Sequence, residues 1–323
     1  MTPPAAPGAG NHPPGRVLAL VGPTASGKTA LALSVARLLP CEIVSADSRQ
    51  VYRDMAVGTA QPSAAELRET THHFVGELPP DREFNAGSFG TIGRRTIGGI
   101  FGRGRLPLVV GGSGLYLRSL LRGLFEGPEA ERAVREALEA RLKTAGAENL
   151  LEDLRKVDPA AAEKLGPVNA RRIIRALEVY ELSGRTITEL HRAGIEIPFD
   201  SLQIGLRWPR PALYERINAR VIGMVNEGLV EETRQLLERG YPPALHSLQT
   251  VGYREAIAHL GGRITRQEMI ATIQMNTRRF AKRQMTWFRA DSTIHWIDID
   301  AGTDLTRIAA DVVRLFGRGA EGK

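Results

Sequence analysis

Six short apolar runs give this chain its regular pattern. Runs of this length that are apolar on both faces are typical of strands in a buried parallel sheet. They fall at Arg16–Val21, Glu42–Val44, His73–Val75, Arg105–Val110, Leu202–Leu206 and Thr293–Ile297. Apolar residues at helical spacing predict helices between them, at Ala30–Leu39, Gly87–Gly104 and Ser113–Leu121. Alternating strands and helices predict an α/β fold with a doubly wound parallel sheet.

The predicted helix at Gly87–Gly104 is unusual because it contains seven glycines. Each glycine costs roughly 1 kcal/mol relative to Ala inside a helix. We therefore expect tertiary packing, rather than intrinsic propensity, to hold this segment helical.

The pattern changes at about Glu126, and helical spacing dominates from there to Gly194. We predict an all-helical insertion domain at 126–194, placed within a P-loop α/β core formed by 16–125 and 195–323. The predicted insertion helices are Glu129–Ala145, Glu148–Lys156 and Asn169–Ser183. Further core helices are predicted at Leu213–Val225, Val230–Glu238 and Gln267–Arg289.

Composition excludes several classes of protein. Of 323 residues, 42% are hydrophobic and 24% are charged, which are globular proportions and not those of a disordered chain. The single cysteine, Cys41, excludes an intramolecular disulfide and a cysteine-based zinc finger. No apolar run reaches the roughly 18 residues of a membrane span. Residues 1–15 are rich in Pro, Ala and Gly and lack the apolar stretch of a secretion signal, so we expect a disordered leader and a cytoplasmic protein.

The positive charge is concentrated in one stretch. The formal net charge is +7, and Arg263–Arg289 contains seven cations and one acid, Glu268. Phe280, Trp287 and Phe288 lie among the cations. Cations neutralise phosphates and aromatic rings stack on bases, so this segment is a candidate surface for nucleic acid. A solvated helix face is an equally good interpretation of this segment alone.

The segment Gly22–Thr29 matches the pattern G-x-x-x-x-G-K-[ST], and we call it the phosphate loop. Its glycines let backbone amides face a polyphosphate, Lys28 adds a point charge, and the Thr29 hydroxyl can hold Mg²⁺. A glycine-rich structural turn is the alternative. The candidate phosphate-binding residues are Gly22, Pro23, Thr24, Ala25, Ser26, Gly27, Lys28 and Thr29.

P-loop kinases and ATPases usually have an aspartate at the end of an apolar strand, and this chain lacks it at the expected strand. The strand Leu106–Val110 ends in Gly111-Gly112 rather than in an aspartate. Asp47 instead follows the second predicted strand. Both positions lie at the carboxyl edge of a parallel sheet, so we expect Asp47 to face the phosphate loop. A cap of a turn is an equally common role for an aspartate before a serine.

Six blocks of sequence, in this order, carry a resemblance to a known family. The chain closely resembles the bacterial tRNA dimethylallyltransferases, or tRNA isopentenyltransferases, from about Val17 to Ile297. The blocks are GPTASGKT (Gly22–Thr29), SADSRQVYRDMAVGTAQP (Ser45–Pro62), PLVVGGSGLY (Pro107–Tyr116), RRIIRALEVYELSGRTITEL (Arg171–Leu190), VGYRE (Val251–Glu255) and KRQMTWFR (Lys282–Arg289).

The resemblance implies a reaction and its participants. The family transfers a dimethylallyl group from dimethylallyl diphosphate to N6 of adenosine 37, beside the anticodon of tRNAs that read codons beginning with U, and diphosphate leaves. The expected partners are a tRNA anticodon stem-loop and dimethylallyl diphosphate, with Mg²⁺ as cofactor. A monomer is expected by default.

Roles of individual residues also follow from the resemblance. By carry-over, Asp47 is the general base, and Lys28 and Thr29 with bound Mg²⁺ stabilise the diphosphate. Ser113 stands where the family usually has Thr, and its hydroxyl would lie near the reacting centre. Arg220 is expected to approach the diphosphate.

The tRNA contacts carry over to residues of both predicted domains. An alternative for the Arg171–Arg175 segment is a helix face paired with acids such as Glu178 and Glu181. The candidate tRNA-binding residues are Asp47, Ser48, Arg49, Gln50, Ser113, Arg135, Arg171, Arg172, Arg175, Gln249, Thr250, Val251, Gly252, Tyr253, Arg254, Lys282, Arg283, Gln284, Trp287 and Arg289.

Two other functions compete with this one. A small-molecule P-loop kinase would use the phosphate loop. However, this chain lacks the aspartate expected of such a kinase, and a kinase would leave the basic segment without a role. A non-catalytic tRNA-binding protein would use the basic segment, but Lys28, Thr29 and Asp47 are all present.

Overall fold

The structure is a computed structural model, and it describes residues 15–125, 127–128 and 131–318. Most of the predicted leader, residues 1–14, lies outside the described residues, while Gly15 is already the first residue of a strand. The chain folds into two compact units. One comprises the described residues up to Leu121 and from Pro198 onward, and the other is Arg122–Ile197. None of the described helices has the length and hydrophobicity needed to cross a membrane.

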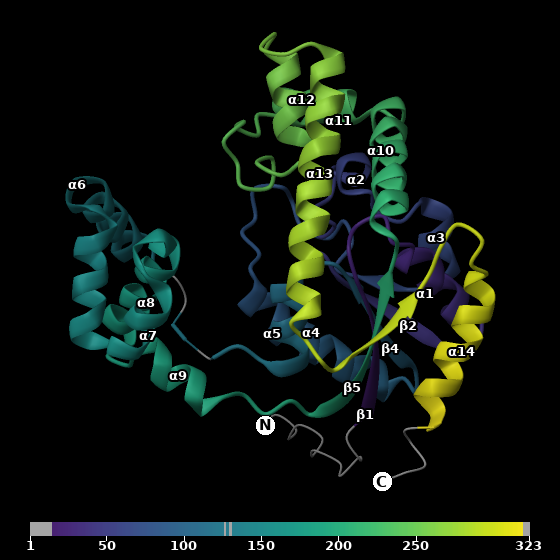
Figure 1. Cartoon of the computed structure of the whole chain (residues 1–323), viewed down its shortest axis with the longest axis horizontal. Coiled ribbons are helices and arrows are strands. Elements are labelled where there is room, and N and C mark those ends of the chain that lie inside the picture. The colour runs from purple at the N-terminus through teal and green to yellow at the C-terminus, as the bar shows by residue number, and fades with distance from the viewer. Residues whose placement is uncertain (1–14, 126, 129–130, 319–323) are drawn as a thin grey trace, which may run out of the picture. The chain divides into compact units, whose positions relative to one another are not determined.

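The first unit is built on a six-stranded sheet in the order β3-β2-β4-β1-β5-β6, and every neighbouring pair is parallel (Figure 1). The strands are β1 (Gly15–Val21), β2 (Cys41–Ala46), β3 (His72–His73), β4 (Leu106–Gly111), β5 (Phe199–Arg207) and β6 (Ile294–Asp298). The predicted α/β class with a parallel sheet is confirmed. The third strand is shorter than predicted because Phe74 adopts φ 64°, outside the strand region.

Helices cover this sheet and extend beyond the ends of its strands. Figure 1 shows α10 to α13 gathered beyond the carboxyl ends of the strands. The helices of this unit are α1 (Lys28–Ala36), α2 (Ala56–Thr59), α3 (Ala64–Glu69), α4 (Ala86–Gly102), α5 (Gly114–Arg122), α10 (Arg210–Asn226), α11 (Leu229–Glu238), α12 (Tyr253–Leu260), α13 (Arg266–Arg289) and α14 (Leu305–Arg318). Of these, α2, α3, α12 and α14 were not predicted.

The connections of the sheet place helices on both of its faces. The chain moves from β1 to β2 in one direction and from β3 to β4 in the other. Because such crossovers are right-handed, α1 and α4 lie on opposite faces. On the α1 face, α14 packs beside α1, and both helices bury apolar residues with the sheet. The core there includes Leu31, Val35, Leu108, Ile204 and Val312.

The glycine-rich helix α4 forms because its glycines admit a close neighbour. A Cβ on Gly90 would lie 2.2 Å from Oγ of Ser119, and one on Gly93 would lie 2.8 Å from Leu120. Phe89, Ile97 and Ile100 are fully buried on the same helix. Close packing against α5 therefore offsets the poor helix propensity of the segment, as expected from its sequence.

The second unit is entirely helical. A core of leucines and isoleucines, including Leu138, Leu150, Leu154, Ile173 and Leu177, joins its helices. Gly146 (φ 80°, ψ 169°) breaks the first helix near its middle, between the two helices that the sequence predicts there. The elements are α6 (Arg132–Val157), α7 (Pro159–Leu165), a 3₁₀ turn (Pro167–Asn169), α8 (Ala170–Ser183) and α9 (Ile187–Ala193).

Candidate active site

The phosphate loop joins β1 to α1 and bends through three residues with positive φ. These are Gly22 (φ 143°), Ala25 (φ 62°) and Gly27 (φ 95°). The value at Ala25 is costly because its Cβ crowds the backbone there. Within the described part of the chain, the amides of Ala25 and Gly27 donate to no acceptor. Such a bend turns amides toward a common point and forms a concavity suited to an anion.

Positive charge is in excess beside this loop. Burial and, to a lesser degree, the nearby charge of Arg220 together lower the pKa of Lys28 to about 7, although the charge of Asp47 opposes this shift. Burial also lowers the pKa of Arg220, while Asp47 again raises it. The Nζ atom of Lys28 donates to the carbonyl of Pro23 at 2.7 Å. Two desolvated cations thus share one nearby carboxylate, and an anion bound between them would relieve their repulsion.

Trp208, just before α10, and two arginines within α10 contact the phosphate loop. Trp208 donates through Nε1 to the carbonyl of Ser26 at 2.9 Å, and Arg216 donates through Nε to the carbonyl of Ala25 at 2.9 Å. The Arg216 guanidinium lies 4.4 Å from the centre of the Trp208 ring. Arg220, one turn later, lies 3.4 Å from the Thr24 hydroxyl. Sequence reasoning identified Arg220 but missed Arg216, although spacing of four residues places the two on one helix face.

Asp47 follows β2 directly and organises the turn after it. Its Oδ1 accepts from the amide of Arg49 at 2.9 Å and from that of Gln50 at 3.4 Å. Its charge acts on Lys28 and Arg220, so it lies beside the phosphate loop, as the parallel topology predicts. Asp47 therefore both caps this turn and lies beside the phosphate loop, and the turn fixes the orientation of its carboxylate.

Ser113 links the ends of β2 and β4. Its Oγ accepts from the amide of Ser48 at 3.1 Å and lies 3.4 Å from the Ser48 hydroxyl. Its own amide donates to the carbonyl of Ala46 at 3.2 Å. A Cβ on Gly111 would lie 2.2 Å from that carbonyl oxygen, so only glycine permits the two strand ends to approach so closely. The Ser113 hydroxyl is thereby held beside the Asp47–Ser48 turn.

Two side chains predicted to contact tRNA, those of Tyr253 and Gln284, are buried in the structure. Tyr253 is 0% exposed, and its hydroxyl donates to Oε1 of Glu232 at 2.5 Å. Gln284 is 6% exposed, and its amide bonds the backbone of Thr24 and of Gly112. A direct tRNA contact by either side chain does not fit this burial. Tyr253 is the first residue of α12 and Gln284 lies within α13, and both side chains point inward.

The outer face of α13 presents the cations expected to meet tRNA. Lys282, Arg283 and Arg289 are exposed, and no carboxylate among the described residues pairs with them. Trp287 is 41% exposed, and the Arg283 guanidinium lies 5.7 Å from the centre of the Phe280 ring. This face keeps both the charge and the aromatic surface that a nucleic acid requires.

The loops beside the site hold other predicted tRNA-binding residues in defined contacts. Arg49 donates to the carbonyl of His246 at 3.2 Å, and the side chain of Gln50 donates through Nε2 to the carbonyl of Ala60 at 2.9 Å. Gln249 and Arg254 are exposed. The remaining members of this set are less accessible: Thr250 and Val251 are half-buried and Gly252 is buried. Gln50 is thus tied to its own loop, whereas Gln249 and Arg254 remain at the surface.

The predicted cations of the helical unit fall into two groups. Arg175 pairs at 2.7 Å with Glu178, which is 0% exposed, and Arg135 lies 3.9 Å from Glu139. Arg171 and Arg172 are exposed in the first turn of α8, without an acidic partner among the described residues. The paired-face interpretation therefore holds for Arg175, and the two free cations are the ones available to a phosphate.

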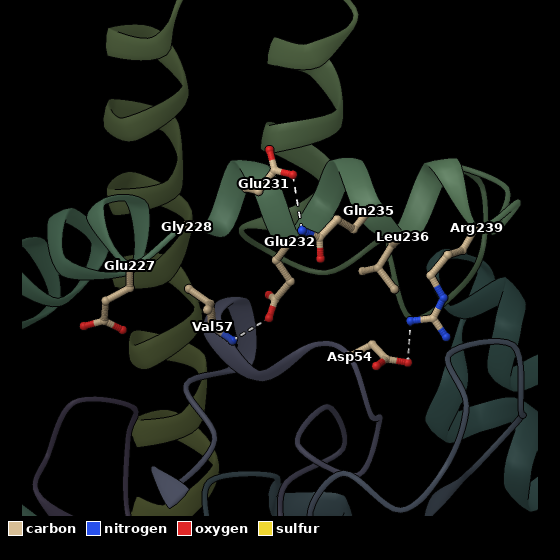
Figure 2. Close-up of a pocket in the computed structure, with 9 residues that line it drawn as sticks. All are labelled: Asp54, Val57, Glu227, Gly228, Glu231, Glu232, Gln235, Leu236 and Arg239. Atoms are coloured by element: carbon tan, nitrogen blue, oxygen red, sulfur yellow. Dashed lines mark hydrogen bonds and ion pairs between the residues drawn. The ribbon is translucent and has the colours of Figure 1, made fainter.

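A cavity of about 330 Å³ is lined by none of the predicted site residues and is acidic (Figure 2). Asp54 and Arg239 form an ion pair at 2.9 Å in its wall, and Glu232 accepts from the amide of Val57 at 2.8 Å. The lining residues are Asp54, Val57, Glu227, Gly228, Glu231, Glu232, Gln235, Leu236 and Arg239. With four carboxylates and one cation, this cavity repels a diphosphate, so it is not the candidate anion site.

A family model described as IPP transferase matches residues 50–291 of the chain. The chain is 46% identical over 284 residues to a protein of Syntrophotalea carbinolica named tRNA dimethylallyltransferase 1, and the match covers 87% of this chain and 90% of that protein. It is 42% identical to a tRNA dimethylallyltransferase of Pelotomaculum thermopropionicum, covering 92% of this chain and 95% of that protein.

Solved structures give the same picture. The tRNA isopentenylpyrophosphate transferase of Bacillus halodurans aligns with a TM-score of 0.70 at 37% identity, covering 95% of this chain and 98% of that chain. A eukaryotic dimethylallyltransferase described as acting on tRNA aligns with a TM-score of 0.78 at 26% identity, covering 93% of this chain and 77% of that chain.

Proposed function

This chain belongs to the IPP transferase family, and we propose that it transfers a dimethylallyl group from dimethylallyl diphosphate to tRNA. The acceptor is N6 of adenosine 37 in tRNAs that read codons beginning with U. The observation that best supports this is the convergence of the phosphate loop, Asp47 and Ser113 at one sheet edge where positive charge is in excess.

The phosphate loop binds the diphosphate of the donor. The free amides of Ala25 and Gly27, the Lys28 ammonium and the Arg220 guanidinium are its candidate ligands. When the bond between the allylic carbon and the diphosphate oxygen breaks, negative charge develops on that oxygen. Donors that are already in place stabilise this charge without reorganising, which lowers the barrier.

The residues present also fit a magnesium ion that is carried largely by the diphosphate. No cluster of three or more metal-ligating side chains occurs among the residues described, and Mg²⁺ at phosphate sites does not require one, because phosphate oxygens and water supply most ligands. Thr29, half-buried on the first turn of α1, would hold the ion through its hydroxyl. An ion held there would supply positive charge that offsets the charge of the leaving diphosphate.

Asp47 and Ser113 act on the acceptor. The exocyclic amine of adenosine attacks the allylic carbon, so a nitrogen–carbon bond forms as the carbon–oxygen bond breaks. The amine must lose one proton, and Asp47, oriented by its turn, accepts it. The Ser113 hydroxyl, held beside this turn, is placed to hydrogen-bond the acceptor. The electron pair of the broken bond leaves with diphosphate, so the reaction balances without an oxidant or reductant.

Exposed cations bind the tRNA. On α13 these are Lys282, Arg283 and Arg289, with Trp287 as a stacking surface, and on the helical unit they include Arg171. We also propose that the protein acts as a monomer in the cytoplasm, where its acceptor is found. Sedimentation of the free protein and of its tRNA complex tests the stoichiometry.

A P-loop kinase is the less favoured function. The strand β4 ends at Gly111, and no aspartate follows it to hold a nucleotide-bound metal. A kinase also leaves the basic face of α13 without a role. A tRNA-binding protein without activity would not need Asp47 beside two desolvated cations.

Two substitutions of Asp47 test its role in this function. Asp47→Asn keeps an oxygen that accepts from the amides of Arg49 and Gln50 but cannot take a proton, whereas Asp47→Ala removes both abilities. If Asp47 is the base, both variants lose transfer by about 10²- to 10⁴-fold, while tRNA affinity stays near that of the unsubstituted protein. Full activity of Asp47→Asn, or ATP turnover without prenyl transfer by the unsubstituted protein, contradicts the proposal.

A further inference from the structure

One buried side chain joins the two loops that the proposed reaction must align. Gln284 projects inward from α13. Its Oε1 accepts from the amide of Thr24, in the phosphate loop, at 2.9 Å. Its Nε2 donates to the carbonyl of Gly112, one residue before Ser113, at 2.9 Å. A single amide therefore spans from the candidate donor site to the candidate acceptor site.

The fit around this amide is close. A Cβ on Gly112 would lie 2.4 Å from Nε2 of Gln284. Three residues further along α13, the indole of Trp287 occupies the space beside Gly114, where a Cβ would lie 2.2 Å from the ring. The helix thus contacts the backbone on both sides of Ser113, and both glycines are needed for that approach.

The two hydrogen bonds also specify the side-chain chemistry. One atom must accept from an N–H while its neighbour donates to a carbonyl, and a primary amide does both at once. A glutamate in this place keeps the acceptor but sets a second oxygen against the carbonyl of Gly112. An isosteric apolar residue leaves both backbone groups without their partner.

The two residues immediately before Gln284 point the other way. Lys282 and Arg283 are exposed on the face of α13 that we propose binds tRNA, and Ala281 and Phe288 are buried on the opposite face with Gln284. The helix is therefore a rigid element with tRNA-binding cations on one side and the donor and acceptor loops on the other.

We propose that Gln284 is a positioning residue that couples docking of tRNA on α13 to the alignment of the phosphate loop with the Ser113 turn. This inference rests on the proposed function, since it assigns the two loops to donor and acceptor. It replaces a direct tRNA contact by Gln284 with an action through the backbone of Thr24 and Gly112.

The test separates the rate of the chemical step from affinity. Gln284→Glu and Gln284→Met are compared with Gln274→Glu, the same change on the same helix, where the half-buried Gln274 bonds only the carbonyl of Asn218. Because a displacement of about 1 Å can cost roughly 100-fold, we expect single-turnover prenyl transfer at saturating substrates to fall about 100-fold in both Gln284 variants. The tRNA dissociation constant is expected to change by less than about twofold, and Gln274→Glu to retain its rate.

A second measurement uses the unsubstituted protein and needs no variant to fold. Inorganic pyrophosphate, an unreactive stand-in for the donor, is titrated with and without an anticodon stem-loop. Coupling through Gln284 predicts that pyrophosphate binds about fivefold more tightly with the stem-loop present, and that Gln284→Met abolishes the difference.

Three results overturn the inference. They are an unchanged transfer rate in the Gln284 variants, a loss of tRNA affinity that accounts for the whole effect, or independent binding of pyrophosphate and stem-loop to the unsubstituted protein. Failure of the unsubstituted protein to prenylate any tRNA instead contradicts the proposed function, so the two failures are distinguishable.

Discussion

Lys28 provides a sharp prediction because its pKa of about 7 lies far below the ordinary value of 10.5. With this pKa, about half of the Lys28 side chains in the ligand-free protein are neutral at pH 7. A diphosphate bound at the loop favours the ammonium form, so binding takes up a proton wherever free Lys28 is neutral. Donor affinity must therefore fall as the pH rises above 7, in addition to any change from the titration of the diphosphate itself.

The magnitude follows from the pKa. With a free pKa of 7 and a bound pKa well above 8.5, the apparent dissociation constant rises roughly 25-fold between pH 6.5 and pH 8.5. Proton uptake by Lys28 at pH 8 is about 0.9 per diphosphate bound. Folding responds in the opposite sense: the unfolded chain binds more protons between pH 7 and 10.5, so the free energy of unfolding of the ligand-free protein rises with pH in that window.

Isothermal titration calorimetry measures the dissociation constant of the donor and the number of protons taken up on binding. Dimethylallyl diphosphate is titrated into the protein in two buffers that differ in ionisation enthalpy, at several values of pH. Lys28→Arg is the matched control, because a guanidinium stays charged across the range and reports only the titration of the ligand. Equal proton uptake by the unsubstituted protein and Lys28→Arg would refute the reasoning, as would an affinity ratio between them that does not change with pH.

Three further outcomes follow from other contacts. Glu42→Gln removes the carboxylate that Arg103 contacts with two bonds at 2.7 and 2.8 Å, so urea denaturation at pH 7 should give a loss of about 2 kcal/mol. Because this ion pair lowers the pKa of Glu42 to about 2, the difference should shrink as the pH falls from 4.5 toward 2; a constant difference contradicts it. Tyr253→Phe removes the hydrogen bond to Glu232 and should lower the free energy of unfolding by about 2 kcal/mol without changing tRNA affinity. Weaker tRNA binding at unchanged stability would instead support a direct contact between Tyr253 and tRNA. Lys282→Ala should weaken the binding of all tRNAs alike and reduce the slope of log affinity against log salt concentration by about 1. An unchanged slope would mean that this cation only faces solvent.

The sequence predicts those parts of the fold that depend on local pattern. Strands such as Arg16–Val21 are apolar on both faces, and the sheet buries them on both faces. The proximity of Asp47 to the phosphate loop also follows, because parallel strands place their carboxyl ends at one edge. The ion pair between Arg175 and Glu178 was an open alternative that their spacing of three residues already allowed.

Other features depend on contacts between distant segments, which a local pattern does not contain. Gln284 lies in a block rich in cations, and only the packing of α13 against Thr24 and Gly112 turns it inward. Tyr253 is buried because residue 58 is a glycine. A Cβ on Gly58 would lie 2.4 Å from the Tyr253 ring, so only a residue without a side chain leaves room for it. In each case the motif marks an important segment but does not say which of its side chains face the substrate.

The central claim is tested most directly by the mass of the product RNA. The protein is incubated with Mg²⁺, dimethylallyl diphosphate and an anticodon stem-loop that carries three consecutive adenosines centred on position 37. We predict a gain of one C₅H₈ unit on adenosine 37, with one diphosphate released for each RNA modified. An RNA of unchanged mass, with ATP consumed when it is supplied in place of the prenyl donor, would contradict this account.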